Sequence, residues 1–318
     1  MGSIIINDKN SKRVATRVAY GNALADLGGK YNFFVMDADL SGSTQTAIFG
    51  KKYPERFVNC GIAEGNMMSV AAGIAASGVP VFASSFAMFA CGRAFEQIRN
   101  SIAYPGLNVK ICATHAGVTV GEDGATHQFC EDIALMRAVP NMTVINPADA
   151  TEAALAVEAI LQHYGPVYMR LGRFAVPVVF DKDNYKFEVG KGVVLADGGD
   201  VAIFASGIMN AAALEARETL AAEGIDAAVI NIHTIKPIDK EIIIKYAEKT
   251  KRIVTAEEHT VIGGLGSAVA DVTSEHCPTR MARVGVEDEF GLSGKAAELL
   301  DYFCLNAAGI VAKVKSLM

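Results

Sequence analysis

Several features that would assign a chain to a particular class of protein are missing from these 318 residues. There is no tryptophan, no Cys-x-x-Cys pair, no Walker A sequence, no His-Glu-x-x-His and no Gly-x-Ser-x-Gly. The sequence therefore gives no support to a cysteine zinc site, a P-loop, a zinc protease or an α/β-hydrolase nucleophile. The six cysteines are scattered between Cys60 and Cys304. Such scatter is typical of reduced, buried thiols in the cytoplasm rather than of a disulfide framework.

An excess of positive charge is also missing, because 29 Lys and Arg stand against 35 Asp and Glu. This balance disfavours a broad nucleic-acid-binding surface. The N-terminal residues 1–13 contain no long apolar core, so we expect no signal peptide. The stretch Gly65–Gly92 carries no charge, but Gly78 and Pro80 interrupt it. We therefore predict a buried helix over residues 63–76 and a buried strand over 79–83, in a cytoplasmic protein that binds no membrane.

The pattern that is present alternates short β-branched or aromatic runs with alanine-rich helical stretches. This alternation predicts β-α-β units, and hence an α/β fold of two doubly wound domains with mainly parallel sheets. The polar segment Asp181–Gly190 is interpreted as a linker, so the expected domains are residues 1–182 and 190–318. The expected strands are Phe33–Met36, Phe57–Asn59, Val79–Ala83, Val109–Ala113, Thr143–Ile145, Val167–Arg170, Val201–Ala205, Ala228–Ile232 and Ile253–Ala256. The expected helices are Arg17–Leu27, Ala63–Ala76, Gly92–Ala103, Ala150–Gln162, Ala211–Ala222, Lys240–Glu248 and Ser267–Glu275.

The densest group of polar residues is Thr114–Gln128, which we call the histidine loop. It contains two histidines, two carboxylates and three glycines directly after the expected strand Val109–Ala113. Ligand sites in parallel α/β sheets lie at the carboxyl ends of strands, so we favour a functional loop over a merely solvated one.

Other residues allow two interpretations on chemistry alone. Glu64 opens an otherwise apolar helix, where it is either a buried acid/base group or an exposed residue that favours the helix dipole. Arg170 and Arg173 follow a strand and either bind phosphate or form surface ion pairs. The turn Gly263–Gly266 either holds a phosphate at a helix N-terminus or lets helix and sheet pack closely, and we favour close packing.

Taken together, these segments resemble the C-terminal half of transketolase. The landmarks occur in the order of that family through nearly the whole chain. They are Ala15–Arg17, Asp37–Ser43, Cys60–Met67, Ser84–Phe89, Thr114–Gln128, Pro166–Arg173, Ile235–Asp239 and Glu257–Asp271. The resemblance implies a pyrimidine-binding domain with the thiamine diphosphate-binding fold, followed by a transketolase C-terminal domain.

The implied cofactor is thiamine diphosphate, which performs the carbanion chemistry while the protein positions it. Glu64 matches the glutamate that shares a proton with the aminopyrimidine ring and thereby promotes deprotonation of the thiazolium carbon. Phe86 and Phe89 match the aromatic residues at that ring, and Phe89 is the favoured stacking ring. Asp39 matches an aspartate near the cofactor at the subunit interface.

The implied substrates are sugar phosphates, between which transketolases transfer a two-carbon ketol unit. His127 matches the histidine that contacts the sugar's hydroxyls and carbonyl oxygen, and Asp123 matches the aspartate that contacts a substrate hydroxyl. The residues that match the phosphate-holding donors are Arg17, Ser43, His115 and Arg173. The sequence does not identify the sugar, although the pentose phosphate pathway offers candidate substrates.

One departure from the family is informative. A full transketolase holds the diphosphate and Mg²⁺ with a Gly-Asp-Gly motif followed by Asn, and this chain has no such motif. The resemblance therefore implies a split transketolase, in which a separate N-terminal subunit supplies the Mg²⁺ ligands. Two copies of each chain, with two active sites, are the expected assembly.

Four alternatives stay open. A 1-deoxyxylulose-5-phosphate synthase-like half is disfavoured by His115, and the β subunit of a 2-oxo acid dehydrogenase first component is disfavoured by residues 121–128. A non-catalytic homologue is disfavoured because Glu64 and both loop histidines are present. A nucleotide-binding domain built on the turn Gly263–Gly266 is the weakest of the four.

Overall fold

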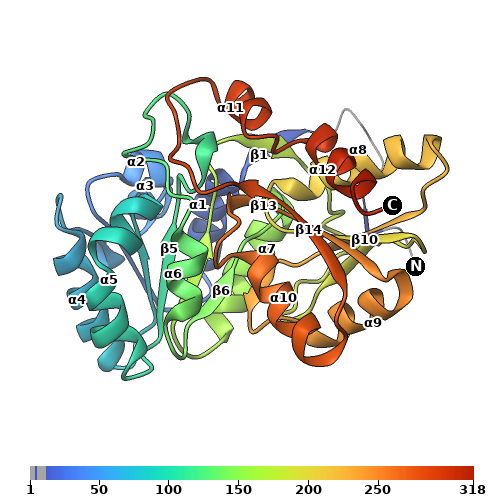
Figure 1. The fold of residues 1–318 in the computed structure, drawn as a ribbon. Coiled ribbons are helices and arrows are strands. Elements are labelled where there is room, and N and C mark those ends of the chain that lie inside the picture. The colour runs from blue at the N-terminus through green and yellow to red at the C-terminus, as the bar shows by residue number, and fades with distance from the viewer. Residues whose placement is uncertain (1–3, 6–11) are drawn as a thin grey trace.

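The computed structural model describes residues 4–5 and 12–318, and two sheets dominate it (Figure 1). The first is seven-stranded and lies with its helices at the blue-to-green side of the molecule. Its strands, in spatial order, are β12 (Thr234–Lys236), β6 (Thr143–Ile145), β7 (Val167–Arg170), β5 (Val109–Ala113), β4 (Val81–Ser84), β2 (Phe34–Asp37) and β3 (Phe57–Asn59). All neighbours pair in parallel except β12, which is antiparallel to β6.

The second sheet has five strands and lies at the yellow-to-red side of the ribbon. In spatial order they are β14 (Arg280–Val286), β13 (Arg252–Thr260), β10 (Val201–Ala205), β11 (Ala227–Asn231) and β9 (Val193–Ala196). Only β9 is antiparallel to its neighbour. A short antiparallel pair, β1 (Arg13–Ala15) and β8 (Ala175–Pro177), completes the strands of the described residues. The predicted α/β class with mainly parallel sheets is confirmed.

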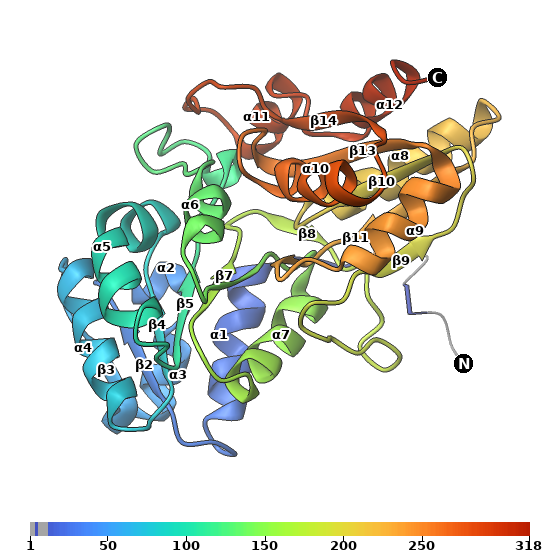
Figure 2. The same cartoon turned by 60° about the horizontal axis from the view of Figure 1, so that its bottom comes forward.

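Helices cover both faces of each sheet (Figures 1 and 2). Around the first sheet they are α1 (Thr16–Leu27), α2 (Ser41–Thr44), α3 (Ala47–Lys52), α4 (Glu64–Ala76), α5 (Phe95–Gln97), α6 (Asp132–Ala138) and α7 (Ala150–Gln162), with the π-helices η2 (Met88–Arg93) and η3 (Ile98–Ala103) and the 3-10 helices η1 (Pro54–Arg56) and η4 (Val118–Val120). Around the second they are α8 (Met209–Ala222), α9 (Lys240–Thr250), α10 (Leu265–His276), α11 (Ala296–Tyr302) and α12 (Ala307–Lys315).

Alternate residues of the buried strands point to opposite faces, which explains why their sequences are apolar throughout. In β4, Phe82 packs with the cluster under α1 and α7, whereas Val81 and Ala83 pack with the cluster under α4 and η3. This second cluster continues into the other sheet through Phe204 and Ile230. A continuous apolar core therefore joins the two halves of the chain.

One expectation is corrected by the structure, and the helix and strand expected within the charge-free stretch are present. The single helix expected over Gly92–Ala103 is instead a run of η2, α5 and η3, because Ala94 (φ −99°, ψ 22°) departs from helical geometry. The charge-free stretch Gly65–Gly92 contains most of α4, all of β4 and most of η2. Among the described residues, no helix has the length and apolarity needed to cross a membrane.

Candidate active site

The predicted site residues gather at one edge of the seven-stranded sheet. Five of them follow the carboxyl ends of five neighbouring strands: Arg173 after β7, His115 after β5, Phe86 after β4, Asp39 after β2 and Glu64 after β3. Parallel strands end at the same edge, so residues distant in the sequence become neighbours there.

A cluster of positive and titratable groups lies at this edge. We call it the histidine–arginine cluster, and its members are Arg17, His115, His127 and Arg173. Arg17 comes from the first turn of α1, and the hydroxyl of the preceding Thr16 accepts a hydrogen bond of 2.8 Å from the amide of Gly172. This bond holds the start of α1 against the segment that follows β7. The structure thus brings both arginines to the same histidine.

The electrostatics of the cluster favour an anion. Burial is the largest cause that lowers the pKa of His115, and the charges of Arg17 and Arg173 and the nearby His127 lower it further, to about 3. Burial and the Arg173 charge also lower the pKa of Arg17. The Nε of Arg17 is buried without a hydrogen-bond partner in the described part of the chain. A dianion such as a phosphate would offset the repulsion between the two arginines and would accept a hydrogen bond from the unpaired Nε of Arg17.

We expect an NMR pH titration of His115 to report this relief. Since its folded pKa lies far below the ordinary value of 6.5, His115 is neutral at pH 7 and shows no inflection between pH 5 and 8. Adding a sugar phosphate raises its pKa by about one unit or more, because the dianion offsets the two arginines. An unphosphorylated sugar at the same concentration is the control. If the pKa of His115 does not change when the sugar phosphate is added, the histidine–arginine cluster does not bind the phosphate.

Two aromatic side chains border the cluster. The rings of Phe86 and His115 stack with centroids 3.7 Å apart, and Phe86 also stacks on Phe89 at 5.9 Å. The rings of His127 and Phe89 form a T-shaped pair, with centroids 5.3 Å apart. His115 covers Phe86, which is buried, whereas Phe89 is partly exposed. Phe89 is thus the more available ring for a planar ligand.

Glu64 is buried, with only 2% of its side chain exposed, so the interpretation as a simply exposed first-turn residue is wrong. Its Oε2 accepts a hydrogen bond of 3.0 Å from Nη1 of Arg93, and the same guanidinium lies 5.3 Å from the centre of the Phe89 ring. Arg93 was not among the predicted site residues. The ion pair offsets the cost of burying the carboxylate. Within the described residues, no group donates to Oε1, which remains available to a ligand.

Three predicted residues have weaker connections to the cluster. Ser43 contacts Arg17 through its backbone carbonyl, which accepts from the guanidinium. Asp39 is exposed, has a positive φ of 66° and exchanges hydrogen bonds with Asn59. Asp123 is exposed on the histidine loop. In the described part of the chain, no hydrogen bond, ion pair or ring contact joins either aspartate to the cluster.

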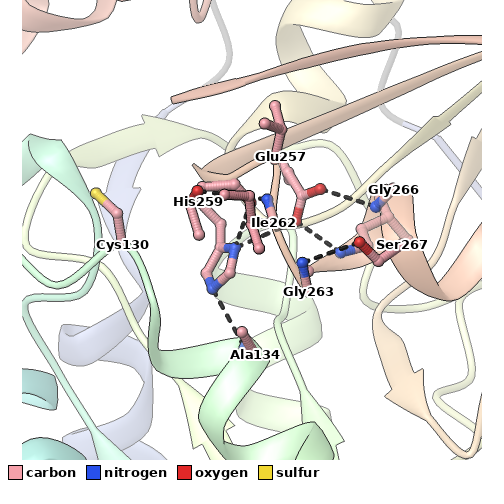
Figure 3. A network of polar contacts seen from close by, with 12 residues as sticks. Cys130, Ala134, Glu257, His259, Ile262, Gly263, Gly266 and Ser267 are labelled. Atoms are coloured by element: carbon pink, nitrogen blue, oxygen red, sulfur yellow. Dashed lines mark hydrogen bonds and ion pairs between the residues drawn. The ribbon is translucent and has the colours of Figure 1, made fainter. Parts of the chain in front are cut away.

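The remaining candidates have structural roles. Arg170 is buried and pairs with Asp132 at 2.8 Å, rather than facing the cluster. At the turn Gly263–Gly266 the carboxylate of Glu257 accepts hydrogen bonds from the amides of Leu265 (2.6 Å) and Gly266 (2.8 Å). Figure 3 shows the bond between Glu257 and Gly266. An internal carboxylate therefore already takes the helix N-terminus that a phosphate would need, and the close-packing interpretation is confirmed.

Comparison with known families identifies the protein family of this chain. The model of the transketolase pyrimidine-binding domain matches residues 12–178, and that of the transketolase C-terminal domain matches residues 190–310. The chain belongs to the transketolase family. This confirms the resemblance in the landmarks and accounts for the clustering of their residues at one sheet edge.

Several relatives of similar length are described as transketolase subunits or sections. The chain is 52% identical to a putative transketolase C-terminal section of Methanocaldococcus jannaschii, over 94% of both chains. It is 46% identical to a 6-deoxy-6-sulfo-D-fructose transketolase subunit of Clostridium sp. (strain MSTE9), over 93% of this chain and 92% of the other. A solved split gene transketolase, described as an inactive beta4 tetramer, is 54% identical and superimposes with a TM-score of 0.89, covering 95% of this chain and 98% of its own.

The chain spans about half the length of single-chain transketolases. The rat enzyme, for example, is 38% identical over 98% of this chain and 50% of the rat sequence. The relatives that it matches over nearly their whole length include a split gene transketolase and a C-terminal section, which agrees with the resemblance to a split transketolase. The synthase-like and dehydrogenase-like alternatives are not favoured by these relatives.

Proposed function

We propose that this chain is the C-terminal subunit of a two-chain transketolase. With a separate N-terminal subunit it transfers a two-carbon ketol unit between sugar phosphates. The observation that carries the proposal is the histidine–arginine cluster at the same sheet edge as the buried Glu64 and the available Phe89 ring. The histidine–arginine cluster suits a phosphate, whereas Glu64 and Phe89 suit a flat heterocycle with a ring nitrogen.

The residues present fit the pyrimidine end of thiamine diphosphate. When bound, this cofactor supplies a carbon nucleophile that accepts the two-carbon unit. Glu64 would hold or move a proton at the ring nitrogen through its unclaimed Oε1, and Phe89 would stack on the ring, with Phe86 behind it. Asp39 would face the cofactor once the partner subunit covers this edge.

The diphosphate end requires a second chain. Among the described residues there is no group of three His, Cys, Asp or Glu side chains that could hold a metal ion. We assign the Mg²⁺ ligands to the N-terminal subunit because this sequence has no Gly-Asp-Gly motif followed by Asn. Two copies of each chain would form a heterotetramer with two sites, in which this chain contributes domains 1–182 and 190–318.

The substrate end uses the histidine loop and the arginines. Arg17, His115 and Arg173 would bind the sugar phosphate, with Ser43 beside them. His127 and Asp123 would contact the sugar's hydroxyls. One relative is a 6-deoxy-6-sulfo-D-fructose transketolase subunit, so that sugar belongs in the same assay as a second donor. We propose ketose and aldose phosphates of the pentose phosphate pathway, in the cytoplasm, as the first substrates to assay.

Reconstitution tests the proposal. The chain is mixed with its N-terminal subunit, thiamine diphosphate and Mg²⁺, and native mass spectrometry is followed by a two-carbon-transfer assay. We expect a two-plus-two complex that retains the cofactor and is active, whereas each chain alone is inactive. A complex that binds the cofactor but transfers no two-carbon unit between sugar phosphates would contradict the proposed reaction.

A further inference from the structure

The strand β13 carries two adjacent buried glutamates whose side chains point to opposite faces of the second sheet. Glu257 faces the start of α10, where it accepts the two amide hydrogen bonds shown in Figure 3. Successive residues of a strand point to opposite faces. Glu258 accordingly points the other way, toward the histidine loop of the first half.

The contact between Glu258 and the histidine loop is close and specific. Its Oε1 accepts a hydrogen bond of 2.7 Å from the backbone amide of Thr119, at the centre of the 3-10 turn η4. Gly117 passes so near that a Cβ there would lie 2.3 Å from the Glu258 carboxyl, and its φ is +77°. Only glycine combines this backbone angle with that approach. The loop is therefore shaped around the carboxylate.

A buried arginine of the first half also fixes the carboxylate itself. Glu258 has 2% of its side chain exposed, and its Oε2 lies 3.9 Å from Nη1 of Arg170. Arg170 also donates to the backbone carbonyl of Glu258 at 2.7 Å. One carboxylate oxygen thus faces the loop while the other faces a buried guanidinium, so the side chain has a single arrangement.

Further contacts hold the far end of the loop to the second half of the chain. Gln128, next to His127, donates from Nε2 to the carbonyl of Leu292 at 2.8 Å. Two residues beyond Gln128, the carbonyl of Cys130 accepts from the amide of Thr260 at 2.8 Å. The segment that carries His115 and His127 is therefore fastened to the second half at its middle and at its end.

We propose that Glu258 is a positioning residue for the histidine loop. It contacts neither substrate nor cofactor, and it acts by holding the Thr119 amide so that His115 and His127 keep their places beside the arginines. The consequence for catalysis rests on the proposed function. The consequence for the loop itself does not, so the two can be tested separately.

The test compares three single substitutions in the full chain. Glu258→Asp keeps the charge next to Arg170 but withdraws the carboxylate from the Thr119 amide by one methylene. Glu258→Gln keeps the reach and an acceptor oxygen but loses the charge. Glu257→Asp makes the same shortening one residue earlier, on the opposite face of β13, and is the matched control.

Hydrogen exchange of residues 114–128 is the first measurement, and it needs no activity. We expect exchange in this segment to accelerate about tenfold or more in Glu258→Asp and to stay within about twofold of wild type in Glu258→Gln and Glu257→Asp. Glu257→Asp should instead accelerate exchange over residues 263–268. Unchanged exchange in Glu258→Asp, or equal acceleration in Glu257→Asp, would overturn the proposal.

Kinetics of the reconstituted complex are the second measurement. We expect Glu258→Asp to raise KM for sugar phosphates about tenfold, with thiamine diphosphate binding within about threefold of wild type and near-normal values for Glu258→Gln. If the loop loosens but the wild-type complex is inactive, the proposed function fails and the positioning role stands. If the loop loosens and KM does not change in an active complex, the catalytic part of the proposal is overturned.

Discussion

Replacing Glu64 with alanine lowers kcat of the assembled enzyme about a thousandfold or more. Positioned acid/base groups contribute roughly 10²–10⁴-fold to a rate, and Glu64 is the buried carboxylate at this end of the sheet with an oxygen available to a ring nitrogen. Glu64→Gln keeps the shape and removes the ionisable group, so it should show a loss of similar size. Steady-state kinetics at saturating thiamine diphosphate provide the measurement.

The subunit should keep its fold in both Glu64 variants. Arg93, the partner of Glu64, has 56% of its side chain exposed, so its charge can turn to water when the carboxylate is removed. Thermal unfolding checks this point, and Glu55→Ala, which removes an exposed carboxylate, is the control. Near-normal turnover in a folded Glu64→Ala complex would refute the assignment of Glu64 and weaken the whole proposed function.

Replacing Arg173 with alanine raises KM for phosphorylated sugars about 10- to 100-fold. The estimate follows from about 1.5–3 kcal/mol for a hydrogen bond to a charged group. KM for an unphosphorylated donor such as hydroxypyruvate should change by less than about threefold. The difference between the two donors is the decisive quantity, because a general disturbance of the site would affect both.

Arg173 also contacts the histidine loop, so its variant needs two controls. Its Nη1 lies 3.1 Å from Oε2 of Glu122, and Glu122→Gln removes this ion pair without removing the guanidinium. Arg13→Ala removes a nearby arginine that instead lies over the Phe174 ring. Both controls should leave KM for phosphorylated sugars nearly unchanged. Equal effects of Arg173→Ala on the two donors would exclude Arg173 from the phosphate site.

Much of the fold could be predicted because the buried parallel strands are short, uniformly apolar runs. The strands β3, β5, β6, β7 and β10 have the predicted bounds. By contrast, β13 extends four residues past the expected Ala256. Charged residues in a sequence usually indicate the end of a buried strand. Glu257 and Glu258 are nevertheless buried, because their carboxylates accept hydrogen bonds from backbone amides and Glu258 also lies near the Arg170 guanidinium. Such partners come from distant parts of the chain and leave no local signal.

The site could be predicted in its chemistry but not in its pairings. The histidine loop and Glu64 stand out in the sequence, and the resemblance added Arg17 and Arg173. Arg93 carried no signal, because its contact with Glu64 depends on the π-helical turn η2. π-helical turns are frequent at functional sites, but they have no distinctive pattern of apolar residues in the sequence.

The edge strand β12 limits how this gene could be divided. Thr234–Lys236 belongs to the second half in sequence, yet it covers the outer edge of β6 in the first sheet. Nearby, Asn231 donates to the buried Glu152 of α7 at 2.8 Å. Fission of the gene within the linker, residues 181–190, would give one product with an open, aggregation-prone edge at β6. It would also take Asn231 away from the buried Glu152, which would keep the hydrogen bond from the Ala148 amide. We therefore expect the two halves to stay on one chain, both in natural homologues and in engineered variants.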